Sequence, residues 1–154
     1  MSMRWLGLLM MLTTGAADAC WQEAGQRYGI NPMLLYGVAK VESTLNPIAL
    51  NTRHFRDTGS YDIGLMQINS RALPALKQYG ISEQDLFDPC TNIYVGAWIL
   101  RQKMSRYPGD PWQAVGAYNA SCTRLKGLEC LRARNTYSWK VYRAMLPLIQ
   151  VSQK

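Results

Sequence analysis

Residues 31–43 read NPMLLYGVAKVES and carry the pattern from which the fold can be worked out. Pro32 suits the first turn of a helix, where a backbone N–H has no partner to lose. With about 3.6 residues per turn, such a helix has one apolar arc. The arc is formed by Leu34, Leu35, Val38, Val41 and Leu45. Glu42 falls inside the arc, so the pattern predicts a helix ending near Ser43 with a carboxyl group on its apolar face.

The position of Glu42 makes it the first candidate for chemistry. Burial of a carboxylate is unfavourable unless the group is neutral or faces a cleft, and loss of water raises its pKa. A general acid that works near neutral pH needs such a raised pKa. The alternative is a glutamate at a helix end that leans into water. We interpret Glu42 as a candidate catalytic residue.

Caps and turn-forming residues divide the rest of the chain into short helices. Helices are predicted at 20–29, 73–79, 89–107, 112–119 and 137–150, with one further turn after Ser82. Residues 47–64 are rich in turn formers and polar groups, which indicates a small β-hairpin or irregular lobe around residues 58–60. The predicted fold class is mainly α, of the α+β type.

The first residues differ in kind from the rest. Arg4 precedes an apolar run over 5–12, and Ala17 and Ala19 are small residues at the positions that a signal peptidase reads. The run is far shorter than the roughly 20 residues needed to span a bilayer. A lipoprotein would require Leu where Ala17 stands. We expect residues 1–19 to be a signal peptide cleaved after Ala19, a domain at 20–154, and no stable membrane insertion.

Export determines how the four cysteines are interpreted. In an oxidising compartment an even number indicates disulfides, and four cysteines allow three pairings. Their spacing along the chain favours Cys20 with Cys90 and Cys122 with Cys130. The chain has no CxxC pair, so zinc or thioredoxin chemistry is not expected, and we predict no metal and no cofactor.

The net charge of +7 at pH 7 suits an anionic partner. Lys and Arg are scattered rather than massed, so an anionic wall or membrane surface is favoured over nucleic acid. His54, between Arg53 and Arg56, is interpreted as a solvated loop residue without a role.

Three short blocks follow one another along the chain. They are Glu42-Ser43, the segment YDIGLMQINS at 61–70, and AYNA at 117–120. In this order they resemble the lysozyme-like lytic transglycosylases, above all the small members that accompany secretion, conjugation and pilus machines. Cys20-Trp21 and Asp88-Pro89-Cys90 also resemble those members, which supports the pairing of Cys20 with Cys90. The resemblance implies a lysozyme-like fold with a substrate cleft.

The resemblance also implies an activity. Glu42 would protonate the bond between N-acetylmuramic acid and N-acetylglucosamine in peptidoglycan, then accept a proton from the muramic C6 hydroxyl as a 1,6-anhydro ring closes. The amides of Gln67 and Asn69 would bind the sugar, and Tyr118 would hydrogen-bond Glu42 or stack on a ring. Ser43 is a further binding candidate, although helix-end and turn polar groups such as Ser43 and Asn69 often serve only the backbone. The implied setting is periplasmic, with a monomer acting on glycan strands for an envelope-spanning secretion or pilus machine.

Asp62 is not required by that mechanism. Animal-type lysozymes carry the motif DYGILQINS, and residues 62–70 read DIGLMQINS. Aligned position for position, Asp62 corresponds to the second catalytic carboxylate of those lysozymes. Hydrolysis by Glu42 and Asp62 is therefore one alternative, and a turn aspartate that bonds the backbone is the plainer interpretation. Another alternative is a glycan-binding or docking protein without turnover. After Ala120 many relatives continue with Gly, whereas Ser121-Cys122 follows here, and the short disulfide loop is a candidate rim of the cleft.

Overall fold

A computed structural model describes the backbone of residues 15–152 and the side chains of residues 20–150. Most of the predicted signal peptide, residues 1–14, lies outside the described residues, so its cleavage stays a prediction. The α-helices are α1 Gly15–Tyr28, α2 Pro32–Ser43, α3 Phe55–Thr58, α4 Leu73–Lys77, α5 Pro89–Arg106, α6 Pro111–Asn119 and α7 Gly127–Ser152. Two 3-10 turns, η1 Ser70–Ala72 and η2 Gln84–Phe87, and three strands, β1 Leu50–Asn51, β2 Asp62–Ile63 and β3 Ile68–Asn69, complete the elements. The predicted fold class, mainly α with a small β lobe, is confirmed.

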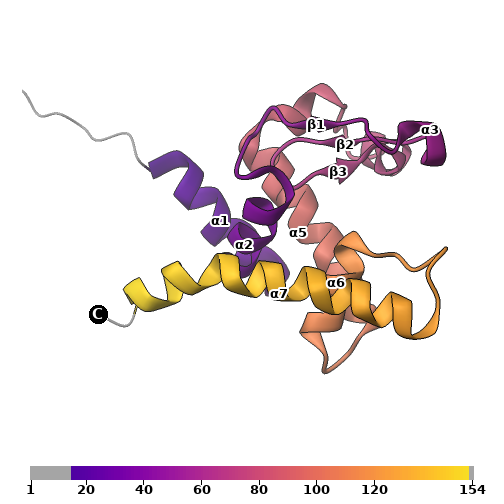
Figure 1. Cartoon of the computed structure of the whole chain (residues 1–154). Coiled ribbons are helices and arrows are strands. Elements are labelled where there is room, and N and C mark those ends of the chain that lie inside the picture. The colour runs from indigo at the N-terminus through magenta and orange to yellow at the C-terminus, as the bar shows by residue number, and fades with distance from the viewer. Residues whose placement is uncertain (1–14, 153–154) are drawn as a thin grey trace, which may run out of the picture.

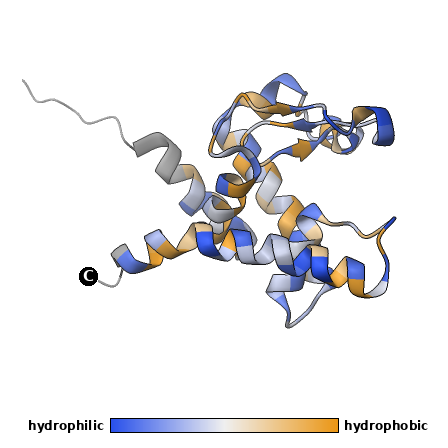
Figure 2. Cartoon of the chain, viewed as in Figure 1, coloured by the Kyte–Doolittle hydropathy of each residue, from blue (hydrophilic) through white to orange (hydrophobic). Residues whose placement is uncertain are grey.

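Helix α5 runs through the middle of the molecule, with the sheet lobe on one side and α6 and α7 on the other (Figure 1). Helix α7 packs against α2 and α6, and α1 packs against α5. Figure 2 shows hydrophobic and hydrophilic residues alternating along α7, as expected of a helix with one buried face. Leu35, Ile93, Leu100 and Val141 are fully buried where these helices meet. None of the described helices has the length and apolarity that crossing a membrane requires.

The three strands form an antiparallel sheet in the order β1-β2-β3. Asp62 of β2 pairs with Asn51 of β1 and with Asn69 of β3. The predicted lobe is therefore present, but residues 58–60 are not the turn of a simple hairpin. Helix α3 lies in the connection from β1 to β2 and ends at Thr58, and Gly59 follows in a left-handed conformation.

The tight turn between β2 and β3 is held by a buried asparagine on α5. The side-chain amide of Asn92 donates to the carbonyl oxygens of Ile63 (3.0 Å) and Leu86 (2.7 Å), and its Oδ1 accepts from the Met66 N–H (2.7 Å). Gly64 has a φ of 73°, and a Cβ at this position would overlap Asn92 and the Leu86 carbonyl. The turn therefore needs both a glycine and the distant asparagine.

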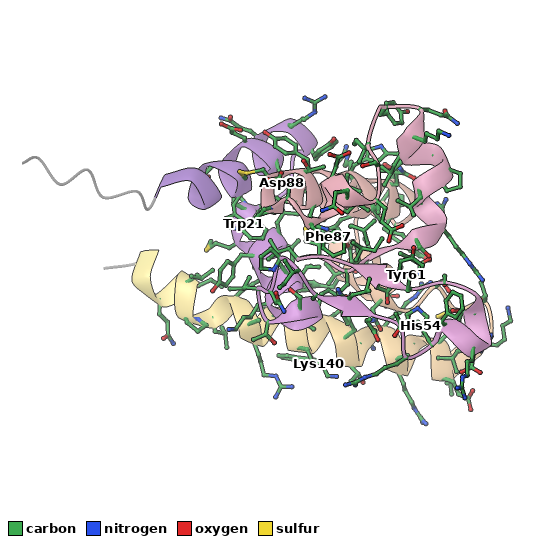
Figure 3. All side chains as sticks on the ribbon, turned by 90° about the horizontal axis from the view of Figure 1, so that it is seen from above. Trp21, His54, Tyr61, Phe87, Asp88 and Lys140 are labelled. Atoms are coloured by element: carbon green, nitrogen blue, oxygen red, sulfur yellow. A yellow bond between two sulfur atoms is a disulfide. The ribbon has the colours of Figure 1, made fainter. Side chains whose placement is uncertain are left out.

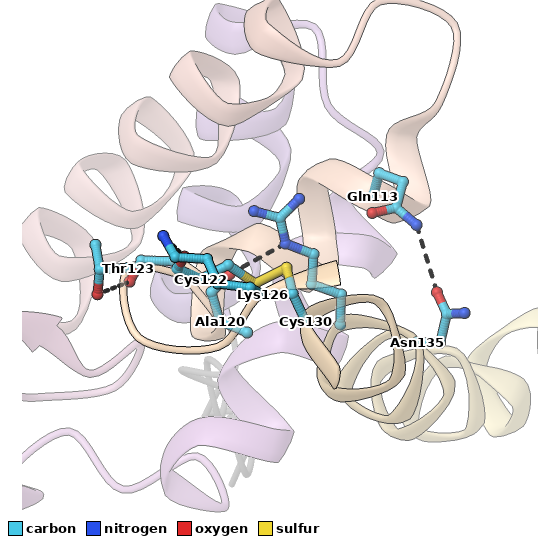
Figure 4. Close-up of a disulfide and its surroundings, with 9 residues drawn as sticks. Gln113, Ala120, Cys122, Thr123, Lys126, Cys130 and Asn135 are labelled. Atoms are coloured by element: carbon cyan, nitrogen blue, oxygen red, sulfur yellow. Dashed lines mark hydrogen bonds between the residues drawn. A yellow bond between two sulfur atoms is a disulfide. The ribbon is translucent and has the colours of Figure 1, made fainter. Parts of the chain in front are cut away.

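Both predicted disulfides are present. Cys20 and Cys90 have Cα atoms 5.4 Å apart and join α1 to the start of α5. Cys122 and Cys130 have Cα atoms 5.5 Å apart and join the loop after α6 to the first turn of α7 (Figure 4).

The predicted last helix, 137–150, begins too late. Helix α7 starts at Gly127 and continues through Pro147. Residues 127–136 show no clear apolar stripe, because an arginine packs where an apolar residue would be expected. Arg134 is 9% exposed, its guanidinium lies 5.0 Å from the ring centroid of Tyr107, and its Nε donates to the Ala120 carbonyl. Helix α1 likewise begins at Gly15 rather than residue 20, and α4 ends two residues earlier than predicted.

Candidate active site

A cleft of about 600 Å³ lies between the sheet lobe and the helices. Five of the six site residues predicted from the sequence line it: Glu42, Asp62, Gln67, Asn69 and Tyr118. The sixth, Ser43, does not line the cleft. Its hydroxyl donates to the Leu65 carbonyl at 2.6 Å and accepts from the Asn46 N–H at 3.0 Å. Ser43 therefore ties the end of α2 to the turn between β2 and β3.

Glu42 is the last but one residue of α2 and reaches the cleft from the apolar side of that helix. Burial raises the pKa of its carboxyl from 4.5 to about 7, a hydrogen bond from Tyr137 opposes this rise, and the negative charge of Asp62 adds to it. A carboxyl group in this state can hold a proton near neutral pH and release it to a bound molecule.

Tyr137 was not among the predicted site residues. Its hydroxyl donates to Oε1 of Glu42 at 2.5 Å, from α7. Burial, together with the nearby Glu42 carboxyl, raises the pKa of Tyr137, so the phenol stays a hydrogen-bond donor. Only 5% of Tyr137 is exposed, and in the sequence it belongs to the apolar stripe of the last helix. No local signal separates it from the core residues of that stripe.

The hydroxyl of Tyr118 does not bond Glu42, which is one of the two contacts predicted for this residue. It donates instead to the Met66 carbonyl at 3.0 Å, and the other predicted contact, stacking on a sugar ring, stays a prediction. Burial is the main reason that the pKa of Tyr118 is well above its usual value, so the phenol keeps its proton. Tyr118 therefore fixes the turn between β2 and β3 from the side of α6, while Tyr137 takes the expected place beside Glu42.

Gln67 adopts a left-handed backbone conformation with a φ of 51°, which is uncommon for a residue with a side chain. Its amide nitrogen donates to the carbonyls of Gly64 (2.9 Å) and Ala49 (3.3 Å). These bonds hold the side chain in the cleft wall. Oε1 receives no hydrogen bond from residues 20–150, so it is a free acceptor for a ligand.

Asp62 is held by two neighbours in the sheet lobe. The amide of Asn69 donates to its Oδ1 at 2.7 Å, and Nε2 of His54 lies 3.5 Å from its Oδ2. His54 lies in the turn before α3 (Figure 3), as a loop residue, and it lines the cleft beside Asp62; that it has no role stays a prediction. The cross-strand pairing of Asp62 with Asn69 explains how the two residues, seven positions apart, meet.

Three cationic side chains, Arg71, Lys103 and Arg124, also line the cleft. Partial burial, with a smaller effect of Arg106 and Arg134, lowers the pKa of Lys103. Cations in a cleft attract an anionic ligand. Among the side chains that the structure describes, no three His, Cys, Asp or Glu are grouped as the ligands of a metal ion would be. The cleft thus offers a carboxyl that can exchange a proton, a second carboxylate and a cationic rim.

Comparisons with known proteins show the family of the chain. The family model "Transglycosylase SLT domain" matches residues 19–132. Invasion protein IagB of Salmonella typhimurium is 44% identical over 138 residues, which cover 89% of this chain and 82% of IagB. Protein IpgF of Shigella sonnei is 38% identical over 141 residues, which cover 91% of this chain and 87% of IpgF.

The fold has a counterpart among solved structures. An inactive mutant of the lytic transglycosylase Slt from Pseudomonas aeruginosa superposes with a TM-score of 0.70 at 20% identity, over 91% of this chain and 25% of Slt. At that identity the likeness concerns the fold, which is lysozyme-like. Because the family model and both relatives cover most of its length, the chain belongs to the transglycosylase SLT domain family of peptidoglycan lytic transglycosylases.

Proposed function

We propose that this protein cleaves the β-1,4 bond between N-acetylmuramic acid and N-acetylglucosamine and leaves a 1,6-anhydro end, with Glu42 as both acid and base. The observation that carries the proposal is the carboxyl of Glu42, whose pKa is raised to about 7 inside a cleft. A group with this pKa is partly protonated and partly ionised near neutral pH, so it can serve in both roles.

In the first step the proton of Glu42 passes to the glycosidic oxygen, and the bond from that oxygen to C1 of the muramic residue breaks. The N-acetylglucosamine residue leaves with a free C4 hydroxyl. Positive charge develops at C1 and the neighbouring ring oxygen. Asp62 lines the same cleft, and in this proposal its carboxylate stabilises the charge.

In the second step the C6 hydroxyl of the same muramic residue attacks C1, and its proton returns to the Glu42 carboxylate. The enzyme regains its starting state, and no water is consumed. The nucleophile is tethered to the reacting centre, so its effective concentration is very high and a second catalytic carboxylate is not required. Tyr137 keeps the Glu42 carboxyl oriented through both steps by its hydrogen bond to Oε1.

Substrate binding is the role that we propose for the side chains lining the cleft. We assign Gln67 Oε1 as an acceptor for a sugar N–H or hydroxyl, since no described residue donates to it. Asn69 positions Asp62, and Tyr118 supports the turn that carries Gln67. Ser43 acts on the same turn through Leu65.

Hydrolysis is the second candidate, because Asp62 lies in the cleft with Glu42 and influences its pKa. In that reaction Asp62 would stabilise or capture the C1 centre and water would complete the cleavage. The two reactions differ in their products, which end in anhydro or in reducing muramic acid.

A digest of purified peptidoglycan tests the proposal. The chain from Cys20 onward and its Glu42→Gln variant are incubated with peptidoglycan, and the released muropeptides are read by mass spectrometry. Products one water lighter than hydrolytic products, absent with Glu42→Gln, are expected. Reducing ends would replace the proposal with hydrolysis. Binding of the glycan without any Glu42-dependent release would indicate a binding protein instead.

We further propose that the protein is exported, loses residues 1–19, and opens the wall locally in the periplasm for an envelope-spanning machine, as a monomer. The similarity to IagB, an invasion protein, over most of this chain supports that setting. The mass of the protein recovered from a periplasmic extract would test the cleavage after Ala19. Assembly of the envelope-spanning machine, compared between wild type and a strain that carries Glu42→Gln, would test the role in opening the wall.

A further inference from the structure

The segment between α6 and α7, residues 120–126, is anchored firmly at its base. The disulfide Cys122–Cys130 ties it to the first turn of α7, and Nε of Arg134 donates to the Ala120 carbonyl at 3.1 Å (Figure 4). Arg134 is itself buried and stacked on Tyr107. We call residues 120–126 the strap.

The tip of the strap contacts the opposite lobe. Nη2 of Arg124 donates to the Asp57 carbonyl at 2.8 Å, although the two residues are 67 positions apart in the sequence. From the lobe itself Arg71 donates to the neighbouring Thr58 carbonyl. Both carbonyls belong to the C-terminal end of α3, where carbonyls lack partners within the helix. Arg124 therefore joins the helical part of the molecule to the sheet lobe.

This junction lies at the cleft that Glu42 also lines, because Arg124 and Thr58 are both lining residues. Figure 1 shows α3 and the loop between α6 and α7 both on the side of the molecule far from α1. Glu42 stands at the end of α2, and Ser121, Thr123 and Arg124 line the same cleft. Glu42 and the strap thus line one cleft, and the bond from Arg124 to the Asp57 carbonyl joins the two lobes beside it.

We propose that the strap, held closed by Arg124, makes glycan strands enter the cleft end first, so that the enzyme cuts near strand ends rather than at internal bonds. This inference rests on the proposed function. A long polymer can be laid sideways into a groove only while the mouth is open. When two lobes are bridged over the groove, the polymer must thread along the axis from an end.

The volume of the cleft is consistent with a glycan strand that enters from its end. A volume of about 600 Å³ is in the range of sites that enclose a small ligand, so a threaded strand has few sugars inside the protein at any time. Short fragments are then the expected early products. The closure depends on one exposed hydrogen bond at the tip, so a single substitution should open it.

The test uses peptide-free glycan strands of known length distribution. Wild type, Arg124→Ala, Arg124→Lys and the double variant Cys122→Ser with Cys130→Ser are compared after equal numbers of bonds have been cut. Glu42→Gln is incubated in parallel to show which cuts depend on Glu42. Arg132→Ala is the matched control, because Arg132 is exposed on the first turns of α7 and takes no part in the bridge. Normalising to bonds cut removes the effect of partial unfolding, which lowers the rate without changing where cuts fall.

Wild type and Arg132→Ala should release short fragments while the remaining strands keep their length. Arg124→Ala should raise the ratio of internal to terminal cuts by about fivefold, the population change that loss of one exposed hydrogen bond permits. The double variant should do the same, and Arg124→Lys, which keeps one charged donor, should restore most of the wild-type ratio. Equal ratios in wild type and Arg124→Ala would overturn the strap proposal while leaving the proposed function intact. Cuts that do not depend on Glu42, or no cuts at all, would instead overturn the proposed function, and the strap proposal with it.

Discussion

The hydroxyl of Tyr137 lies 2.5 Å from Oε1 of Glu42 and donates to it, although the two residues are 95 positions apart. Helix α7 packs against α2, and this packing brings the phenol to the carboxyl. The bond opposes the effect of burial on the pKa of Glu42, since a donor favours the ionised form. Tyr137 therefore both orients the candidate acid and adjusts its acidity.

Replacement of Tyr137 by Phe should raise the pKa of Glu42 further, because the hydrogen bond that lowers it is lost. The limb of the pH profile that reports Glu42 ionisation should move to higher pH. Turnover should fall about tenfold, as expected when a catalytic group loses its orienting partner. The measurement is kcat/KM against pH. Tyr142→Phe, on the same helix but outside the cleft, is the control, and an unchanged profile in Tyr137→Phe would remove Tyr137 from the site.

The pKa of Glu42 also predicts how stability depends on pH. Between 4.5, its value in the unfolded chain, and about 7, the folded protein retains a proton that the unfolded chain releases. The stabilising contribution is fully present below pH 4.5 and is lost as pH rises through 7. Glu42→Gln lacks this dependence, so its stability relative to wild type should increase by up to about 3 kcal/mol from pH 4 to pH 8. Urea unfolding of both proteins across this range is the measurement, and parallel curves would contradict the raised pKa.

Removal of the Asp62 charge should lower the pKa of Glu42, whereas removal of the Tyr137 hydroxyl should raise it. The negative charge raises the pKa of Glu42, but less than burial does. In Asp62→Asn the Glu42 limb of the pH profile should therefore move to lower pH by less than about one unit. If ring closure is the reaction, the products should still be anhydro forms. Asp57→Asn, exposed in the same lobe, is the control, and loss of all turnover in Asp62→Asn alone would favour hydrolysis by the carboxyl pair.

Two glycines with similar backbone angles should respond very differently to Ala. Gly64 has a φ of 73° and sits against Asn92 and the Leu86 carbonyl, whereas Gly59 has a φ of 65° with no neighbour within 4 Å of a new Cβ. Gly59→Ala should cost about 1 kcal/mol of unfolding free energy from the backbone alone. Gly64→Ala should cost about 3 kcal/mol or more, since the buried Asn92 network must also move. Thermal or urea unfolding measures both, and equal losses would contradict the role of Asn92.

Much of the fold could be predicted from the sequence because its signals are local. Pro32, the apolar arc of α2 and the caps of α5 are read within a few residues of one another, and the structure agrees with them. The position of Glu42 on an apolar face was likewise visible, as was the lobe of turn formers after α2. The disulfide pairing followed from spacing and resemblance, and both bonds are present. The start of α7 was missed because a buried Arg134 replaces the usual apolar residue.

The sequence by itself determined that the chain is mainly helical and singled out Glu42 as the candidate acid. It also singled out Asp62, Gln67, Asn69 and Tyr118, which line the same cleft, since each lies in a short recognisable block. Only the tertiary structure decided which side chain contacts which. In it Tyr137 rather than Tyr118 hydrogen-bonds Glu42. Asn92 hydrogen-bonds the turn that carries Gln67, and Arg124 hydrogen-bonds the end of α3. Each of these bonds joins residues 26 to 95 positions apart. The packing of distant helices and strands determines which of these side chains meet. The periodicity of a single segment shows which face is buried but not what it packs against.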